Sequence, residues 1–316
     1  MIDVVALGEL LIDFTCIATD AHGYPTMAAH PGGAPANFLA ALSSFGARTA
    51  LLGKVGSDAF GKCLLNTLQE AQIETRGMVS TQDVFTTLAF VTLDATGNRE
   101  FSFARKPGAD TCLQFEELDL SLIDEAKVFH FGTLSLTDEP ARTATRKAVA
   151  YARQHGKLIT YDPNLRKPLW KDLQVCKREM LWGLQQADVV KISDEEVQFL
   201  FDMGVEEGAE YILRNFGVQL VFVTCGADGC YYQNAKASGK VASLQGISVV
   251  DTTGAGDIFG GSAVWKLLQC SQLPGELDRE TLEDVVHFAC TAAGLSTTRS
   301  GGISSVPTFE MVMSCL

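Results

Sequence analysis

The sequence lacks a surplus of positive charge. It carries 25 lysines and arginines against 38 aspartates and glutamates, a net charge of −13, and no basic stripe interrupts this balance. Such a surface repels a polyanion, so we expect no nucleic-acid partner. A nucleotide can still bind where local donors and a metal ion offset its charge.

Long apolar runs and paired cysteine motifs are also missing. No run approaches the ~20 residues of a membrane-spanning helix. The N-terminal sequence MIDVVALGELLIDF has acids where a signal peptide needs basic residues, so we expect neither membrane insertion nor export. The nine cysteines form no C-x-x-C pair, and no histidine lies at metal-ligand spacing from a pair. This predicts reduced, mostly buried thiols in a cytoplasmic protein.

Hydrophobic residues make up 47% of the 316 positions, which is enough for one large α/β domain or two smaller ones. Low-complexity segments and fixed-period repeats are absent from the sequence. Strand and helix patterns alternate along most of the chain, which predicts a mainly parallel sheet with ligands at the carboxyl ends of its strands. Strands are expected at 2–8, 49–55, 86–93, 99–104, 127–131, 158–161, 187–192 and 218–223, and helices at 138–154 and 287–298.

The stretch DTTGAGD at 251–257 carries the strongest chemical signal. Gly254 and Gly256 flank an alanine, so a ligand can approach the backbone closely. Apolar residues at helical spacing follow, so the loop opens a helix whose free N–H groups form an anion site. Asp257 lies in that site. From the loop alone it is either a carboxylate that satisfies a backbone N–H or a base beside a bound phosphate.

A second glycine-rich stretch, GGAPAN at 32–37, also precedes a helical pattern. Pro35 suits a first helical turn, and Gly46 suits the position after the helix end. The two glycines permit close approach of a ligand, and Asn37 offers both a donor and an acceptor.

The segment GSDAFGKC at 56–63 nearly matches the phosphate-binding pattern G-x-x-x-x-G-K-[ST]. Cys63 replaces the hydroxyl that should contact a metal, and Asp58 would face the phosphates. We therefore reject a P-loop at this position.

The stretch at 251–257 and the segment 32–61 together resemble the two signatures of the ribokinase-like (PfkB) carbohydrate kinases. The segment DPNLR…LW at 162–170 is similar to the fructokinases of that family. The resemblance extends from about residue 4 to residue 307. It implies a single domain over 1–316, with a doubly wound, mainly parallel α/β sheet and a small β-sheet lid formed by about 13–31 and 84–105.

The resemblance also implies roles for residues. Asp257 would accept a proton from the sugar hydroxyl, and the amides of Ala255, Gly256 and Asp257 would stabilise the transferring phosphoryl group. Gly254 would belong to the same catalytic loop. Sugar would be bound by Asp13, Gly32, Gly33, Asn37, Arg105 and Arg166. From the residues alone, Asp13 and Arg105 are also consistent with solvated surface charges, and Arg166 with a salt bridge to Asp162.

Three further sets follow from the resemblance. ATP would contact Lys191, Ser193, Thr224, Gly226, Gly229, Gly254 and Gly256. Glu196 would support Mg²⁺ indirectly, although Ser193 stands where the family often has asparagine, and a helix-capping role for Glu196 stays open. A monovalent cation such as K⁺ would lie near Asp251, Thr253, Ser296, Arg299, Gly301 and Ser305.

These resemblances lead us to expect transfer of the γ-phosphate of ATP to the 6-hydroxyl of D-fructose. The alternatives are a kinase acting on 2-keto-3-deoxygluconate, ribose or a ribofuranoside, and a kinase-like binding protein without turnover. The apolar residues Leu88, Phe90 and Val91 either pair across a homodimer or cover the site.

Overall fold

The computed structural model describes residues 1–93 and 99–316, so the connection between the strands expected at 86–93 and 99–104 lies outside the described residues. The strands are β1 Val4–Leu7, β2 Leu11–Thr19, β3 Pro25–Gly32, β4 Thr49–Gly56, β5 Ile73–Glu74, β6 Met78–Thr81, β7 Leu88–Leu93, β8 Arg99–Ala104, β9 Val128–Gly132, β10 Leu158–Asp162, β11 Val189–Ser193, β12 Leu220–Thr224, β13 Cys230–Asn234 and β14 Ser238–Val241.

Ten α-helices and several 3₁₀ turns connect these strands in the described residues. The α-helices are α1 Ala34–Ser44, α2 Ala59–Glu70, α3 Leu120–Glu125, α4 Ala141–Gln154, α5 Leu173–Gln186, α6 Asp194–Phe201, α7 Val205–Phe216, α8 Ala255–Leu267, α9 Arg279–Ser296 and α10 Phe309–Met313. The helix expected at 287–298 is longer in the structure, where α9 starts at Arg279. It begins after Asp278, whose carboxylate accepts the N–H of Thr281 at 3.0 Å as an N-cap.

The central sheet has the strand order β14-β13-β12-β11-β10-β9-β1-β4-β5, with β6 paired to β4 outside this path. Neighbours from β12 through β9 and β1 to β4 and β5 are parallel, and β13 and β14 add an antiparallel edge. β4 lies on one side of β1 and β9 lies on the other, so the direction in which strands are added to the sheet reverses at β1. This reversal is the place where open α/β sheets bind ligands.

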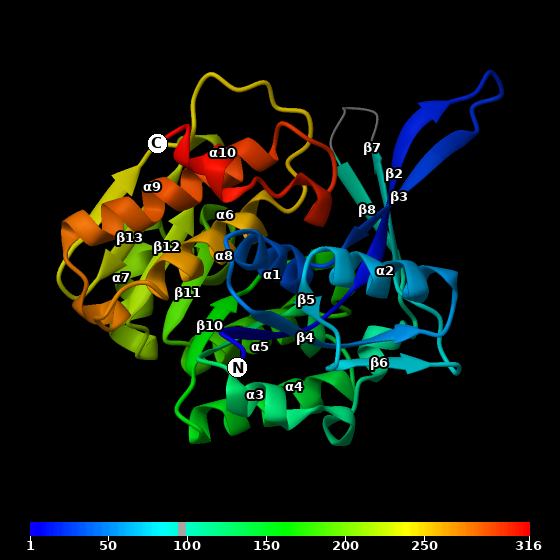
Figure 1. Cartoon of the computed structure of the whole chain (residues 1–316), viewed down its shortest axis with the longest axis horizontal. Coiled ribbons are helices and arrows are strands. Elements are labelled where there is room, and N and C mark those ends of the chain that lie inside the picture. Colours follow the sequence, from blue (N-terminus) through cyan, green and yellow to red (C-terminus); the bar gives the residue numbers. More distant parts are fainter. Residues whose placement is uncertain (94–98) are drawn as a thin grey trace.

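Helices cover both faces of this sheet (Figure 1). Along β1 the side chains alternate: Val5 and Leu7 join the core beneath α3–α7, whereas Val4 and Ala6 join the core shared with α1. Both faces of the strand are therefore apolar, as the continuous hydrophobic run predicts. The expected doubly wound, mainly parallel α/β fold is confirmed.

A separate small sheet has the order β3-β2-β7-β8. The two strands expected at 86–93 and 99–104 pair in this sheet as antiparallel neighbours, β7 and β8. In Figure 1 the β2–β3 hairpin projects away from the helices and the central sheet. On the inner part of this sheet, Phe14 stacks on Phe90 at 5.3 Å between ring centroids and meets Phe60 of α2 edge-on at 5.5 Å.

The segment at 56–63 is a strand-to-helix turn without a phosphate site. Asp58 caps α2, and its carboxylate accepts the N–H groups of Phe60 at 2.9 Å and Gly61 at 2.8 Å. The donors that a phosphate needs are already occupied, so the rejection of a P-loop is confirmed.

Two sequence expectations concern the protein as a whole. The cysteines are not mostly buried: three are buried, three are half-buried and three are exposed, because several lie on loops and outer helix faces. Within 1–93 and 99–316 we find no helix with the length and apolarity needed to cross a membrane.

Candidate active site

The turn before α8 brings two distant loops together. Gly254 has a φ of 76°, which favours glycine. A Cβ at this position would lie 3.1 Å from Asn37 Nδ2 and 3.1 Å from Gly302 Cα. Glycine therefore allows the helix N-terminus to approach both the start of α1 and the C-terminal loop.

The first N–H groups of α8 point out of the helix without helical partners. The N–H of Ala255 donates to Thr252 O at 3.3 Å. No hydrogen bond among the described residues uses the N–H of Gly256 or Asp257 as its donor. These two amides, at the positive end of the helix, remain available for an anion.

Asp257 lies in the first turn of α8 and is 9% exposed. Asn37 of α1 donates from Nδ2 to Asp257 Oδ2 at 2.9 Å. No hydrogen bond among the described residues joins this carboxylate to a backbone N–H, so it does not cap its helix. Of the two interpretations of Asp257 from the loop, these contacts leave that of a base beside a bound phosphate.

Burial raises the pKa of Asp257, and the positive charges of Lys191 and Arg166 and the Asn37 hydrogen bond oppose this rise. Lys191 Nζ would lie 3.0 Å from a Cβ built on Gly256, which places the ammonium directly beside the α8 N-terminus. A positive group at this point suits a site that receives phosphate charge.

Asp13 lies on β2, at the inner end of the small sheet, where it pairs with His30 of β3. Burial raises its pKa to about 6, Arg166 lowers it, and Asp257 and Asp251 raise it further. The groups that act on Asp13 show that the small sheet carries this carboxylate to the α8 turn. Asp13 is half-buried, so it is not a fully solvated surface charge.

Gly32 and Gly33 join β3 to α1. Gly33 has a φ of 119°, and a Cβ there would lie 2.4 Å from Glu9 O. A Cβ on Gly32 would lie 2.3 Å from Asp13 Oδ2. Gly33 is thus required by close backbone packing against Glu9, and Gly32 leaves space for the Asp13 carboxylate. The predicted close approach of a ligand to these glycines stays a prediction.

Lys191 of β11 forms an ion pair with Asp162 at the end of β10, with 2.9 Å between Nζ and Oδ2. Burial raises the pKa of Asp162, and Lys191 opposes this. Asp162 was not among the expected site residues. Its position at the carboxyl end of a buried parallel strand could have indicated a place in the site. Arg166, on the loop that follows β10, donates from Nη1 to Leu165 O at 3.1 Å.

Glu196 and Ser193 form a capping box at the start of α6. The Glu196 carboxylate accepts the N–H of Ser193 at 2.8 Å and that of Leu165 at 2.6 Å. The capping alternative is therefore confirmed, and Glu196 also ties α6 to the loop that carries Arg166. Each carboxylate oxygen of Glu196 thus has one backbone partner, and its indirect role toward a metal ion stays a prediction.

Thr224, Gly226 and Gly229 lie at the end of β12, where Ser193 and Thr224 are register partners on adjacent parallel strands. Gly226 and Gly229 have positive φ values of 53° and 90°. The structure thus brings the expected nucleotide residues to one edge of the central sheet, next to Lys191.

Asp251 organises the C-terminal loop. Its Oδ1 accepts from Thr253 N and Oγ1 at 2.9 and 2.7 Å, and its Oδ2 accepts from Gly301 N at 3.0 Å. Ser305 donates to Gly302 O at 2.8 Å. Because these contacts consume side-chain oxygens, a cation here would rely on backbone carbonyls.

Two other residues expected near a cation point elsewhere. The hydroxyl of Ser296 donates to Ala293 O at 2.7 Å within α9. Arg299 extends its guanidinium to Met311 of α10 at 3.3 Å. Among the described residues, no group of three or more His, Cys, Asp or Glu side chains could hold a metal by itself.

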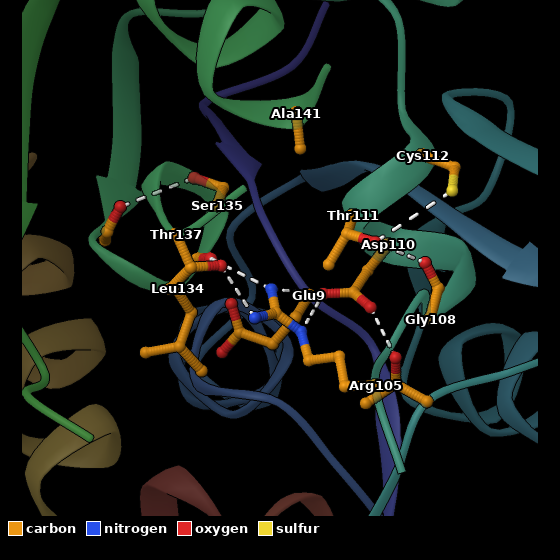
Figure 2. A network of polar contacts seen from close by, with 12 residues as sticks. Glu9, Arg105, Gly108, Asp110, Thr111, Cys112, Leu134, Ser135, Thr137 and Ala141 are labelled. Carbon is orange, nitrogen blue, oxygen red and sulfur yellow. Dashed lines mark hydrogen bonds and ion pairs between the residues drawn. The ribbon is translucent and has the colours of Figure 1, made fainter. Parts of the chain in front are cut away.

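Arg105 is buried in a network with Asp110, Thr137 and Leu134 (Figure 2). Its side chain is 2% exposed. The alternative of a solvated charge is therefore wrong. Glu9, which belongs to the same network, was missed at the sequence level, although it lies only four positions before Asp13.

This arrangement is that of a phosphotransferase site, and comparison with known proteins identifies its class. The family model described as pfkB family carbohydrate kinase matches residues 1–309, so the chain belongs to this family.

Similar proteins carry a narrower name. Fructokinase-2 of Solanum habrochaites is 39% identical over 316 residues, covering 99% of this chain and 95% of the relative. Fructokinase-1 of Zea mays is 40% identical over 314 residues, covering 98% and 96%. The solved structure of Xylella fastidiosa fructokinase with bound ATP has a TM-score of 0.91 and 30% identity, covering 99% of this chain and 97% of the other. Vibrio cholerae O395 fructokinase with fructose, ADP and calcium has a TM-score of 0.88 and 30% identity, covering 100% and 99%.

Proposed function

We propose that this chain is an ATP-dependent fructokinase, which transfers the γ-phosphate of ATP to the 6-hydroxyl of D-fructose. The observation that carries the proposal is the buried Asp257 carboxylate, oriented by Asn37 beside two available amides and within the field of Lys191. The choice of fructose as the substrate is supported by the fructokinases that resemble this chain over nearly its whole length.

The sugar is held by side chains from both sheets. Asp13, carried by β2 of the small sheet, accepts hydrogen bonds from the sugar hydroxyls, and Gly32 and Gly33 let the chain turn closely beside it into α1. Arg166 faces Asp13 and Asp257 and supports the same end of the substrate. The 6-hydroxyl then lies at Asp257 Oδ1.

Proton transfer and charge stabilisation follow from this placement. Asp257 accepts the hydroxyl proton as the oxygen attacks the γ-phosphorus in line. Negative charge on the transferring group is received by the N–H groups of Gly256 and Asp257 and by the α8 dipole. Lys191 adds a positive charge and is held in place by Asp162.

ATP and metal ions complete the reaction. The nucleotide lies along the edge formed by Lys191, Ser193, Thr224, Gly226 and Gly229. Glu196, which also anchors the loop at Leu165, would support Mg²⁺ indirectly, and the ion would offset negative charge on the ATP phosphates. K⁺ is the proposed monovalent ion beside Asp251.

The chain is proposed to be one domain over 1–316 whose small sheet, about 13–31 and 84–105, acts as a lid. A lid over the sugar excludes water, which otherwise competes as phosphoryl acceptor. The same sheet is the proposed contact of a homodimer, because Ile17 and Tyr24 near the hairpin tip are 63% and 70% exposed. Light scattering of wild type and Ile17→Asp tests this contact.

The direct test is ADP release with Mg-ATP across fructose, ribose, glucose, 2-keto-3-deoxygluconate and adenosine, with and without K⁺. Strongest turnover on fructose supports the proposal, and a K⁺ response supports the cation. Strongest turnover on another acceptor replaces the substrate but keeps the role of Asp257. Silence on every acceptor, with ATP still bound, favours a kinase-like binding protein.

A further inference from the structure

The small sheet is joined to the central body at four places along the chain. These are the segment between β1 and β2, the β3–α1 junction at Gly33, the approach to β7, and the exit from β8. Each of these junctions contributes a group to one buried polar network: Glu9, Ala34 N, Thr87 and Arg105, respectively.

Arg105 and Asp110 form the centre of this network. Nε and Nη2 of Arg105 contact Asp110 Oδ2 at 2.8 and 2.7 Å, and both side chains are nearly inaccessible. Nη1 donates to Thr137 Oγ1 at 2.8 Å, and Nη2 donates to Leu134 O at 2.9 Å. Thr137 and Leu134 follow β9 of the central sheet. All three guanidinium nitrogens therefore bond to protein atoms, and they connect the end of β8 to the body.

Two further contacts bring in the remaining junctions. Thr87, directly before β7, donates its hydroxyl to Asp110 Oδ1. Glu9 Oε1 accepts the N–H of Ala34, the first residue of α1, at 3.0 Å. In Figure 2 the Glu9 carboxylate lies beside the Arg105 guanidinium, on the side away from Asp110.

This network reaches the catalytic carboxylate through one helix. Glu9 holds the first residue of α1, and Asn37 in the first turn of that helix donates to Asp257. The same network holds both ends of the β7–β8 hairpin, while β2 of that sheet carries Asp13. A single buried cluster thus supports both the sheet that carries Asp13 and the helix whose Asn37 orients Asp257.

We propose that Arg105, Asp110, Thr87 and Glu9 are positioning residues that fix the base of the small sheet and so set the fraction of enzyme able to bind sugar. The proposal rests on the proposed function for its substrate. In this proposal Arg105 positions the small sheet and does not contact the sugar directly. A carboxylate on each side of a buried guanidinium holds its planar fork in one orientation, which a lysine cannot reproduce.

The test compares two network variants with two matched variants of the body. Asp110→Asn and Thr87→Val weaken the network. Glu179→Gln changes a largely buried carboxylate of α5, which pairs with Arg146 at 2.7 Å. Thr145→Val removes a buried hydroxyl of α4. Steady-state kinetics for fructose and ATP are measured well below the unfolding temperature, together with amide hydrogen exchange of β2 and β7.

Both network variants are expected to raise KM for fructose about tenfold or more, because a smaller fraction has the sugar-binding arrangement. Their kcat and KM for ATP should stay within about threefold of wild type, and exchange in β2 and β7 should accelerate. Arg105→Lys should behave as Asp110→Asn does. The body variants should lower the unfolding temperature without these changes.

Unchanged KM for fructose and unchanged exchange in Thr87→Val overturn the proposal, and this uncharged variant serves even if Asp110→Asn does not fold. Equal changes in the body variants also overturn it. A wild type that does not phosphorylate fructose refutes the proposed function instead, and the exchange comparison still tests the network.

Discussion

Asp257 combines burial with a fixed orientation. Its Oδ2 is held by Asn37, so an asparagine at 257 keeps the shape but loses the proton acceptor. We expect Asp257→Asn to lower kcat by ~10²–10⁴-fold, the usual contribution of a general base, with little change in KM. ADP release measures this. Asp284→Asn, an exposed carboxylate on α9, is the control, and near-normal turnover of Asp257→Asn would contradict the assignment.

Asp13 gives the site a pH dependence. Its pKa of about 6 means that the carboxylate gains a proton as pH falls through that value, and a protonated carboxyl is a weaker acceptor for sugar hydroxyls. We expect kcat/KM for fructose to fall below about pH 6 and to be restored on returning to pH 7.5. Burial also raises the pKa of Asp257 above the ordinary aspartate value of 3.8. As pH is lowered, kcat should therefore begin to fall at a higher pH than an ordinary aspartate would give.

The two acids can be separated by a variant. Asp13→Asn cannot titrate, so its kcat/KM should be low and should lose the inflection near pH 6, while the fall in kcat caused by Asp257 remains. A full pH profile of both parameters measures this. An inflection near pH 6 that survives in Asp13→Asn would assign it to another group.

At the scale of an element, helix α1 depends on glycines at both ends for different reasons. Gly46, after the helix, has a φ of 89° and no atom within 4 Å of a built Cβ, so alanine there adds backbone strain alone. Gly33 has both an unfavourable φ and a Cβ position 2.4 Å from Glu9 O.

We therefore expect Gly46→Ala to cost roughly 1–2 kcal/mol of unfolding free energy with normal kinetics. Gly33→Ala should cost more and should also lower kcat/KM for fructose, because the helix that carries Asn37 must shift. Urea unfolding and ADP release measure the two effects. Equal losses in both variants would show that strain alone matters at Gly33.

At the scale of the molecule, substrates should stabilise the fold because their binding groups come from both sheets and from strands far apart in the chain. Ligand at 100 times its dissociation constant adds about 2.7 kcal/mol to the free energy of unfolding. We expect fructose and an uncleavable ATP analogue each to raise the unfolding temperature by several degrees in a thermal shift assay, and more when combined. The absence of any shift with fructose, beside a shift with the analogue, would contradict sugar binding.

Local patterns in the sequence were sufficient for much of the fold. The helix start at Gly254, the α1 boundaries at Gly33 and Gly46, and the buried parallel strands all follow from backbone geometry and periodicity, which act over a few residues. The start of α9 was placed too late, although Leu282, Val285 and Val286 already follow helical spacing after the Asp278 N-cap. The burial of the cysteines was also misjudged, since composition does not say which face of a helix a thiol occupies.

The sequence by itself determined the fold class, the two glycine-rich helix starts and the candidate base. Only the tertiary structure decided that Asn37 orients Asp257 across 220 positions, that Lys191 pairs with Asp162, and that Arg105 lies in a buried network. The physical reason is range. Periodicity and turn chemistry act between neighbours in the chain, whereas these pairs form only when strand order and helix packing bring distant segments into contact.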